Sequence, residues 1–257
     1  MLRSRIIPCL LVHNKGLVKT TYFKEPKYIG DPINAVKIFN EKNADELMVL
    51  DIDASRNNSE PNYEMIKKLA AECQMPLCYG GGIKNREQAI KIIDLGVEKI
   101  SLSSILYKNI NLISEIATSI GSQSVVATID LLKKKSIFKT TYECRTRNML
   151  DLEDVDAFDF IRLCENEGVG EIVINSIDRD GEMKGYDIEL ARKLKNIVKI
   201  PLTILGGAGS HDDMKELISK CGIIGSAAGS LFVFKGKYRA VLINYPSQEK
   251  KHIICNN

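Results

Sequence analysis

The stretch Asn175-Ser176-Ile177-Asp178-Arg179-Asp180-Gly181 decides the fold, together with Gly206-Gly207-Ala208-Gly209 further along the chain. An apolar run rich in β-branched residues precedes each motif, at residues 171–174 and 200–205. Both runs predict buried strands that end abruptly in acidic or small residues. Carboxylates and glycine turns at strand ends are typical of a barrel or an open α/β sheet whose ligand site lies at that end.

The first half of the chain repeats this pattern. Residues 47–53 form an apolar run that ends in carboxylates, and Gly80-Gly81-Gly82 and Ser103-Ser104 follow it. The interval from Gly82 to Gly207 is one residue shorter than the interval from Ser104 to Ser230, and such a fixed period indicates a duplicated unit. Two such units would place two glycine loops opposite each other, which suits a ligand with a phosphate at each end.

We therefore predict an α/β protein that is a single (β/α)8 TIM barrel over residues 1–257, built from two duplicated half-barrels, about 1–120 and about 121–245. The alternating residues 136–142 predict a small hairpin over the barrel mouth, and residues 20–28 predict a mobile loop. The apolar segment after Phe234 is too short for its periodicity to choose between a helix and a strand.

A chain of 257 residues with 44% hydrophobic content can bury the core of one such barrel. The net charge of +3 is too small to indicate nucleic-acid binding. No apolar run approaches the ~18 residues of a membrane helix, and no signal peptide precedes the first predicted strand. The seven cysteines lack a C-x-x-C pair, which is typical of a reducing compartment. We expect a cytoplasmic protein without nucleic acid, membrane, metal or cofactor.

Motifs along nearly the whole chain are shared with a known family. They are Arg5-Ile6-Ile7-Pro8-Cys9-Leu10, Gly30-Asp31-Pro32, Asp45-Glu46-Leu47, Gly80-Gly81-Gly82-Ile83, Gly121-Ser122-Gln123, Asp178-Arg179-Asp180-Gly181, Gly185-Tyr186-Asp187 and Gly206-Gly207-Ala208-Gly209. With these motifs the chain resembles HisF, the cyclase subunit of imidazole glycerol phosphate synthase. The resemblance implies a lyase-type subunit of a glutamine amidotransferase complex. It implies that ammonia comes from a HisH-like glutaminase subunit at the N-terminal barrel face and passes through the barrel to a phosphorylated small-molecule ligand at the opposite face.

The resemblance also implies the site residues. In the family two aspartates act as general acid and base, a role that needs two carboxylates with separated protonation states. Asp130 matches the catalytic aspartate of strand five, whereas Leu11 stands at the equivalent place in strand one. Because leucine transfers no proton, the resemblance leaves open whether this barrel catalyses a step itself. The implied substrate-binding residues are Lys19, Asp51, Gly81, Gly82, Ser103, Ser104, Asp180, Gly181, Gly206, Gly207, Gly229 and Ser230.

Four charged residues at predicted strand starts match the family's ammonia gate: Arg5, Glu46, Lys99 and Glu171. Residues at equal height on the strands of a closed barrel form a layer, so we expect these four side chains to meet. The plain alternative is that they only cap exposed strand ends. A buried ring of charges is costly to desolvate and adds little stability, so such a ring would favour a polar passage.

Three functions follow from these observations. The replacement at Leu11 and the ending at residues 234–246 are similar to a branch of the family that serves acetamidino modification of nucleotide sugars in surface polysaccharide (lipopolysaccharide, O-antigen) biosynthesis. In that branch, ammonia goes to a separate sugar amidotransferase. Ser103 and Leu205 also depart from the asparagine and serine usual in the family. The alternatives are a cyclase subunit of histidine biosynthesis that tolerates Leu11, and a non-catalytic scaffold for a glutaminase and a sugar amidotransferase.

Overall fold

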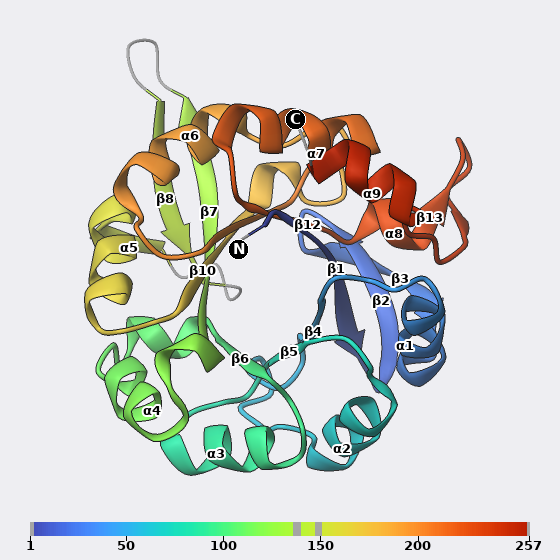
Figure 1. The fold of residues 1–257 in the computed structure, drawn as a ribbon. Helices are drawn as coiled ribbons and strands as arrows, with labels where there is room; N and C mark the ends of the chain where they lie inside the picture. The colour runs from blue at the N-terminus through green and yellow to red at the C-terminus, as the bar shows by residue number, and fades with distance from the viewer. Residues whose placement is uncertain (1–2, 136–139, 147–150, 256–257) are drawn as a thin grey trace.

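Eight parallel strands close into a barrel, and helices surround it (Figure 1). The structure, a computed structural model, describes residues 3–135, 140–146 and 151–255. Each barrel strand pairs with the next, and β12 returns to pair with β1. This arrangement confirms the predicted (β/α)8 TIM barrel. In spatial order the barrel strands are β1 (Arg5–His13), β4 (Leu47–Asp51), β5 (Leu77–Gly80), β6 (Lys99–Leu102), β7 (Val125–Lys135), β10 (Glu171–Ser176), β11 (Leu202–Leu205) and β12 (Gly225–Ala228).

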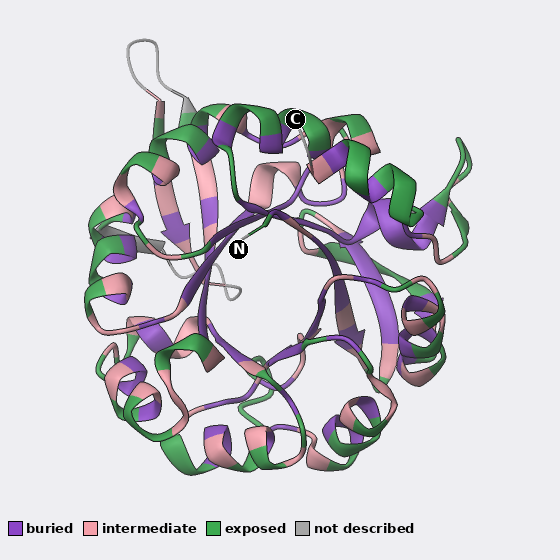
Figure 2. Cartoon of the chain, viewed as in Figure 1, coloured by how far each residue is buried: buried purple, intermediate pink, exposed green. Residues whose placement is uncertain are grey.

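Amphipathic helices with one buried and one exposed face cover the outside of the barrel (Figure 2), and the short helix at residues 230–233 is buried throughout. Local sequence fixes where they begin: Asp31 caps α1 by accepting from Asn34 N at 2.9 Å, and Pro32 occupies the first helical position. In the described part of the chain, no helix has the length and apolar character needed to span a membrane. The helices are α1 (Pro32–Glu41), α2 (Tyr63–Glu72), α3 (Arg86–Asp94), α4 (Leu112–Ile120), α5 (Ala157–Asn166), α6 (Ile188–Ile197), α7 (His211–Cys221), α8 (Ser230–Val233) and α9 (Gln248–Cys255), with short 3-10 turns η1 (Ser104–Tyr107), η2 (Ser122–Ser124) and η3 (Ile177–Arg179).

The core has two parts, one inside the barrel and one between the strands and the helices. Successive residues of a strand point to opposite faces, so one barrel strand can contribute to both parts. On β1, Ile7 and Cys9 face inward, whereas Ile6 and Leu10 face the helices. We call the inner group the interior cluster; it consists of Ile7, Cys9, Met48, Cys78, Val126, Val173, Leu205 and Ala227.

An antiparallel extension follows the fifth barrel strand. β7 pairs with β8 (Thr140–Arg145), from Asp130 opposite Arg145 to Lys135 opposite Thr140. β8 pairs in turn with β9 (Asp151–Asp156). The predicted hairpin is therefore present, and its residues 136–139 lie outside the described part of the chain.

A second hairpin stands where we predicted a mobile loop. β2 (Gly16–Thr21) pairs antiparallel with the end of β1 and with β3 (Lys24–Gly30). The tight turn between them places Tyr22 and Phe23 at φ angles of 51° and 61°. The loop prediction was wrong because the outer strand of a hairpin exposes polar and basic side chains, so its alternating pattern resembles a solvated loop.

The C-terminal segment, whose structure the sequence left undecided, contains both a hairpin and a helix. β13 (Phe234–Lys235) and β14 (Ala240–Val241) pair antiparallel, and α9 follows. Between them, the Tyr245 hydroxyl donates to Ile6 O at 2.8 Å and accepts from Asp45 N at 3.0 Å. These bonds attach the end of the chain to the start of the barrel.

Candidate functional site

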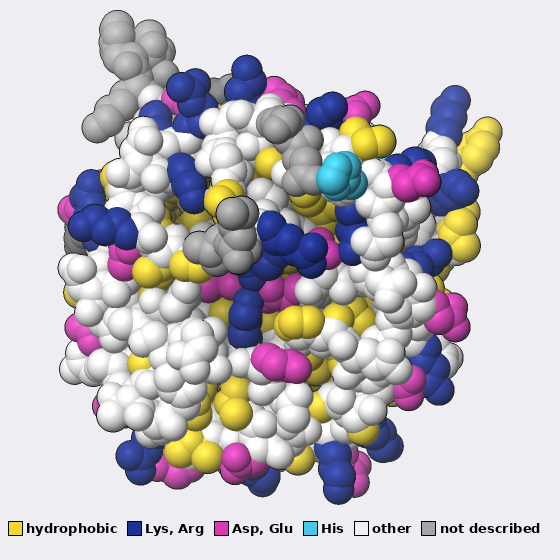
Figure 3. Space-filling view, in the orientation of Figure 1, with side chains coloured by type: hydrophobic (Ala, Val, Ile, Leu, Met, Phe, Trp, Pro, Cys, Tyr) yellow, Lys and Arg dark blue, Asp and Glu magenta, His cyan; other side chains and the backbone are white. Residues whose placement is uncertain are grey.

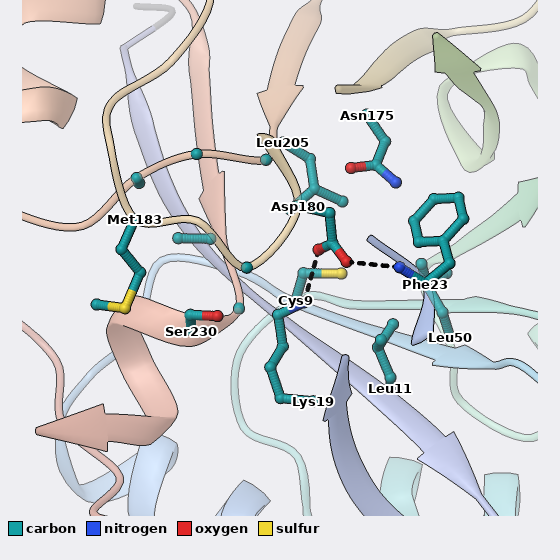
Figure 4. A pocket seen from close by; sticks show the side chains of 16 residues that line it. Cys9, Leu11, Lys19, Phe23, Leu50, Asn175, Asp180, Met183, Leu205 and Ser230 are labelled. Carbon is teal, nitrogen blue, oxygen red and sulfur yellow. Dashed lines mark hydrogen bonds and ion pairs between the residues drawn. The ribbon is translucent and has the colours of Figure 1, made fainter. Parts of the chain in front are cut away.

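The glycine loops of the second half line a pocket at the barrel mouth (Figure 4). Gly206 and Gly207 follow β11 with φ angles of 96° and 108°, a region that favours glycine. A Cβ at Gly207 would lie 2.2 Å from Gly185 O, so the loop has no room for a side chain there. Gly229 and Ser230 line the same pocket, and the Ser230 hydroxyl is buried without a partner among the described residues. Exposed backbone N–H groups beside a hydroxyl suit an anion.

Lys19 and Asp180 form a buried ion pair in this pocket. Lys19 lies on β2, and its Nζ is 2.6 Å from Asp180 Oδ1. The Thr20 hydroxyl and the Phe23 N–H also donate to Asp180 Oδ2, at 3.2 and 3.4 Å. Gly181 lines the pocket directly after Asp180. The pair therefore joins the first hairpin to the loop that follows β10.

Apart from Lys19, the predicted binding residues of the first half lie away from this pocket. Asp51 Oδ1 accepts from Asp53 N at 2.9 Å and from Ala54 N at 3.1 Å, which turns the loop after β4. Gly82 N lies 3.5 Å from the Ser55 hydroxyl in the neighbouring loop. The structure brings together Lys19, Asp180, Gly181, Gly206, Gly207, Gly229 and Ser230, and it places Asp51, Gly81, Gly82, Ser103 and Ser104 after β4, β5 and β6 in the other half of the mouth.

Asp130 is held by Asn175, a residue that the sequence reasoning missed. The two are register partners on β7 and β10, and Asn175 Nδ2 donates to Asp130 Oδ1 at 2.8 Å. Asn175 lines the pocket, is 8% exposed, and its Oδ1 has no partner among the described residues. The available signal was alternation: residues 171, 173 and 175 point to one side of β10, and Glu171 was already assigned to the barrel interior.

Two leucines occupy the opposite side of the pocket. Leu11 and Leu50 are register partners on β1 and β4, and both line the pocket and pack against the interior cluster. In Figure 4, Asn175 lies on one side and these leucines on the other. Leu11 thus places an apolar side chain where the resemblance would place the second carboxylate.

At the other end of the barrel, Arg5, Glu46, Lys99 and Glu171 meet in one layer, as predicted; we call it the charged ring. Arg5 is hydrogen-bonded to Glu46, and its Nη2 lies 2.7 Å from Glu171 Oε1. Lys99 Nζ lies 2.8 Å from Glu46 Oε1 and 2.9 Å from Glu171 Oε2. Figure 3 shows basic and acidic side chains gathered at the centre of the face where the N-terminus lies. The contacts fit one layer across the barrel axis, and the role as an ammonia gate stays a prediction.

Mutual attraction keeps the ring charged. Burial alone would raise the pKa of Glu171, but the hydrogen bond and charge of Arg5, with Lys99 and Thr203, lower that pKa to about 2. Burial alone would lower the pKa of Lys99, yet the carboxylates of Glu171 and Glu46 raise it above its ordinary value. Glu171 and Lys99 are therefore both charged at neutral pH.

Thiol and metal chemistry find little support at this site. Burial raises the pKa of the Cys9 thiol to about 12, so Cys9 beneath the pocket is protonated at neutral pH and is a poor nucleophile. Within residues 3–135, 140–146 and 151–255, no group of three or more His, Cys, Asp or Glu is arranged to hold a metal ion. Hydrogen bonding and charge are the chemistry that this pocket offers.

Comparisons with known proteins agree along the whole barrel. The pattern of the family described as "Histidine biosynthesis protein" matches residues 5–239. The chain is 56% identical to a Vibrio vulnificus protein, over 98% of this chain and 96% of that protein. It is 53% identical to a Leptospira interrogans protein, over 99% of both chains, and 52% identical to a Pseudomonas aeruginosa protein, over 97% of this chain and 98% of the other. All three relatives carry names that assign them as HisF-type subunits of imidazole glycerol phosphate synthase.

Proposed function

The chain belongs to the histidine biosynthesis protein family, and from this premise we propose that it is the barrel subunit of a glutamine amidotransferase complex. A HisH-like glutaminase would dock over the charged ring and deliver ammonia into the barrel. Ammonia would leave at the mouth, where the glycine loops bind a phosphorylated ligand. All seven cysteines are free thiols, which supports a place for this complex in the reducing cytoplasm.

The charged ring supports the ammonia route. Buried ion pairs contribute little net stability, so four charged side chains in one layer call for another explanation. Above the ring, the Ser101 and Thr128 hydroxyls form a buried hydrogen bond of 2.7 Å. Ammonia is small, polar and neutral, and polar side chains along the axis would lower the cost of its passage.

The recipient that we propose is the acetamido group of a nucleotide sugar, converted to an acetamidino group by a separate sugar amidotransferase during surface polysaccharide biosynthesis. The observation that carries this choice is Leu11 on the wall opposite Asp130. With one carboxylate in the pair, the two-group acid–base chemistry of cyclisation lacks a partner. Supply of ammonia needs no such pair.

The alternative is a cyclase subunit of imidazole glycerol phosphate synthase in histidine biosynthesis. The names of the relatives favour this alternative, because each name describes a subunit of imidazole glycerol phosphate synthase. A third reading, a non-catalytic scaffold, shares the docking surfaces of the first and lacks its ammonia route.

Deletion of this gene in its own bacterium tests the choice. We expect the deletion strain to grow without histidine and to lose the amidino group from its surface polysaccharide, measured by mass spectrometry of the released sugars. Complementation in trans is the control for effects on neighbouring genes. A strain that needs histidine and keeps an unchanged polysaccharide would establish the alternative.

The phosphate loops can be tested separately. In crystals grown with inorganic phosphate we expect one anion beside Gly207 and Ser230 and a second beside Gly82 and Ser104, because both loops present N–H groups and hydroxyls. Crystals of a Gly207→Ala variant are the control, since the added Cβ would meet Gly185 O. Two empty loops in uncrowded crystals would contradict the proposal.

A further inference from the structure

Asn175, hydrogen-bonded to Asp130, presents a fixed acceptor to the pocket. A carboxylate can only accept hydrogen bonds, so the 2.8 Å contact with Asp130 fixes the Asn175 carboxamide with Nδ2 toward Asp130 and Oδ1 away from it. Gly206 keeps the space beside that oxygen open, because a Cβ there would come within 3.2 Å of Asn175 Oδ1. A buried acceptor without a partner in the described structure calls for a donor.

The apolar wall lies across the barrel axis from this pair. Going round the barrel from β1, β7 is the fourth strand in either direction, and β10 stands in the same relation to β4. Leu11 and Leu50 are register partners on β1 and β4, as Asp130 and Asn175 are on β7 and β10. Leu205, the register neighbour of Asn175 on β11, adds a further apolar side chain to the pocket.

We propose that the centre of this pocket selects a planar nitrogen group with N–H donors on one edge and a small alkyl group on the other, the chemistry of an alkyl amide or amidine. An N–H group donates to Asn175 Oδ1, and the alkyl group contacts Leu11 and Leu50. This inference goes beyond the proposed function, in which a separate sugar amidotransferase makes the acetamidino group.

In this proposal, Leu11 has a binding role of its own. An aspartate at this position would add a further charge to a pocket that already contains Lys19 and Asp180, and an alkyl group packed against it would gain nothing from its burial. Leucine supplies apolar area that an alkyl substituent can cover. Asn175 Oδ1 supplies the unpaired acceptor on the facing side. The same substitution that removes one proton-transfer group therefore makes the pocket two-sided.

Acetamidine is a suitable probe because it carries a methyl group and N–H donors on one small planar frame. Guanidinium has the N–H donors without the methyl, and acetone has methyl groups without a donor. We would add each probe to protein with 13C-labelled leucine methyl groups and follow the Leu11 and Leu50 signals by NMR. The signals are assigned from Leu11→Asn and Leu50→Asn variants. Acetamidine should shift both signals saturably and show NOEs from its methyl group to them, and guanidinium and acetone should bind about tenfold more weakly.

Variants separate the two walls. Asn175→Leu should weaken acetamidine about tenfold, because it removes the Oδ1 acceptor, and should leave acetone unchanged. Leu11→Asn should weaken acetamidine and leave guanidinium unchanged. Leu163→Asn, at a leucine 42% exposed on α5, is the matched control and should change nothing. The fold of each variant is first compared with that of the wild type by circular dichroism. If a variant unfolds, the inference is tested by the affinities of the three probes for the wild type alone.

Two results would overturn the inference: no saturable shift with acetamidine, or equal binding of acetamidine and guanidinium in the wild type. Neither result touches the proposed function, because polysaccharide loss on gene deletion is measured independently. If the deletion strain keeps its amidino sugar while acetamidine binds as expected, the inference about the pocket is supported and the proposed role in polysaccharide biosynthesis is contradicted.

Discussion

At the scale of single residues, Leu11 and Asn175 set the chemistry of the mouth. Leu11 gives an apolar side chain on β1, and Asn175 on β10 holds the remaining carboxylate of Asp130 through a 2.8 Å hydrogen bond. Lys19 is also fixed, because its ion pair with Asp180 measures 2.6 Å and is buried. The residues that bear charge in this pocket are thus held in place before any ligand binds, which lowers the entropic cost of binding.

Introducing Leu11→Asp should restore the missing proton-transfer group. We expect the wild type to leave a cyclase-deleted bacterium dependent on histidine, and Leu11→Asp to allow growth without it. A positioned acid or base typically contributes about 10²–10⁴-fold in rate, enough to separate the two by growth. Leu50→Asp is the control, since it adds a carboxylate in the same pocket on the neighbouring strand. Rescue by the unmodified gene would show that Leu11 is compatible with cyclisation.

At the scale of elements, the hairpins and the C-terminal segment brace the barrel from outside. β2 and β3 carry Lys19 to the pocket, and Lys133 on β7 lies 2.7 Å from Asp187, which caps α6. Tyr245 attaches the C-terminal segment to the start of the barrel, because its hydroxyl bonds the backbone of both Ile6 and Asp45. Each of these contacts joins segments that are distant in the sequence, so each holds a whole helix, strand or segment in place against the barrel.

Tyr245→Phe should lower stability without altering the fold. The change leaves Ile6 O and Asp45 N without their partner, and a buried group that loses its hydrogen bond costs about 1–3 kcal/mol. For a chain of this size we expect the Tm to fall by roughly 2–10 °C, measured by circular dichroism. Tyr238→Phe is the matched control, because Tyr238 is 89% exposed. Equal Tm values for the two variants would show that the hydrogen bonds of the Tyr245 hydroxyl do not stabilise the fold.

At the scale of the whole molecule, the barrel joins two polar ends through an interior that combines apolar side chains with the hydrogen-bonded Ser101 and Thr128 hydroxyls. The charged ring lies at the N-terminal strand ends, the ligand pocket lies at the mouth, and the interior cluster lies between them. The ring belongs to four strands from both halves of the chain, so its charges assemble only in the folded state. Its ionisation therefore couples to global folding.

Acid should destabilise the protein through Glu171. The folded-state pKa of about 2 lies below the ordinary value of 4.5, so Glu171 contributes stability above pH 4.5 that is lost as the pH falls toward 2. Glu171→Gln should reduce the loss of unfolding free energy between pH 5 and pH 3 by roughly 1–3 kcal/mol, measured by urea unfolding. Glu216→Gln, at an exposed site on α7, should keep the wild-type pH dependence. An unchanged slope in Glu171→Gln would exclude this carboxylate as the source.

Nitrogen transfer through the barrel should depend on Lys99. With the glutaminase, the barrel and the sugar amidotransferase together, we would supply amide-labelled glutamine and unlabelled ammonium. Lys99→Met should leave glutamine hydrolysis largely intact and lower the labelled fraction of the product, because the charged ring loses a member. Lys199→Met, an exposed lysine, is the control. If unlabelled ammonium enters the wild-type product as readily as labelled nitrogen, ammonia reaches the amidotransferase through bulk water. That result would favour the non-catalytic scaffold function.

The sequence by itself predicted the barrel and the glycine loops at its mouth, and the roles of the site residues stay predictions. Apolar runs that end in carboxylates and glycines, repeated at a nearly fixed interval, predict strands whose ligand ends meet, because backbone geometry and side-chain alternation act locally. The hairpin at β2 and β3 was not predicted, since the exposed face of an outer strand has the composition of a loop. Only the tertiary structure decided that Asn175 holds Asp130, that Leu50 lies beside Leu11, and that Tyr245 is hydrogen-bonded to Ile6. Those contacts depend on strand register and barrel closure. Both are properties of the whole closed sheet, so no single stretch of sequence predicts them.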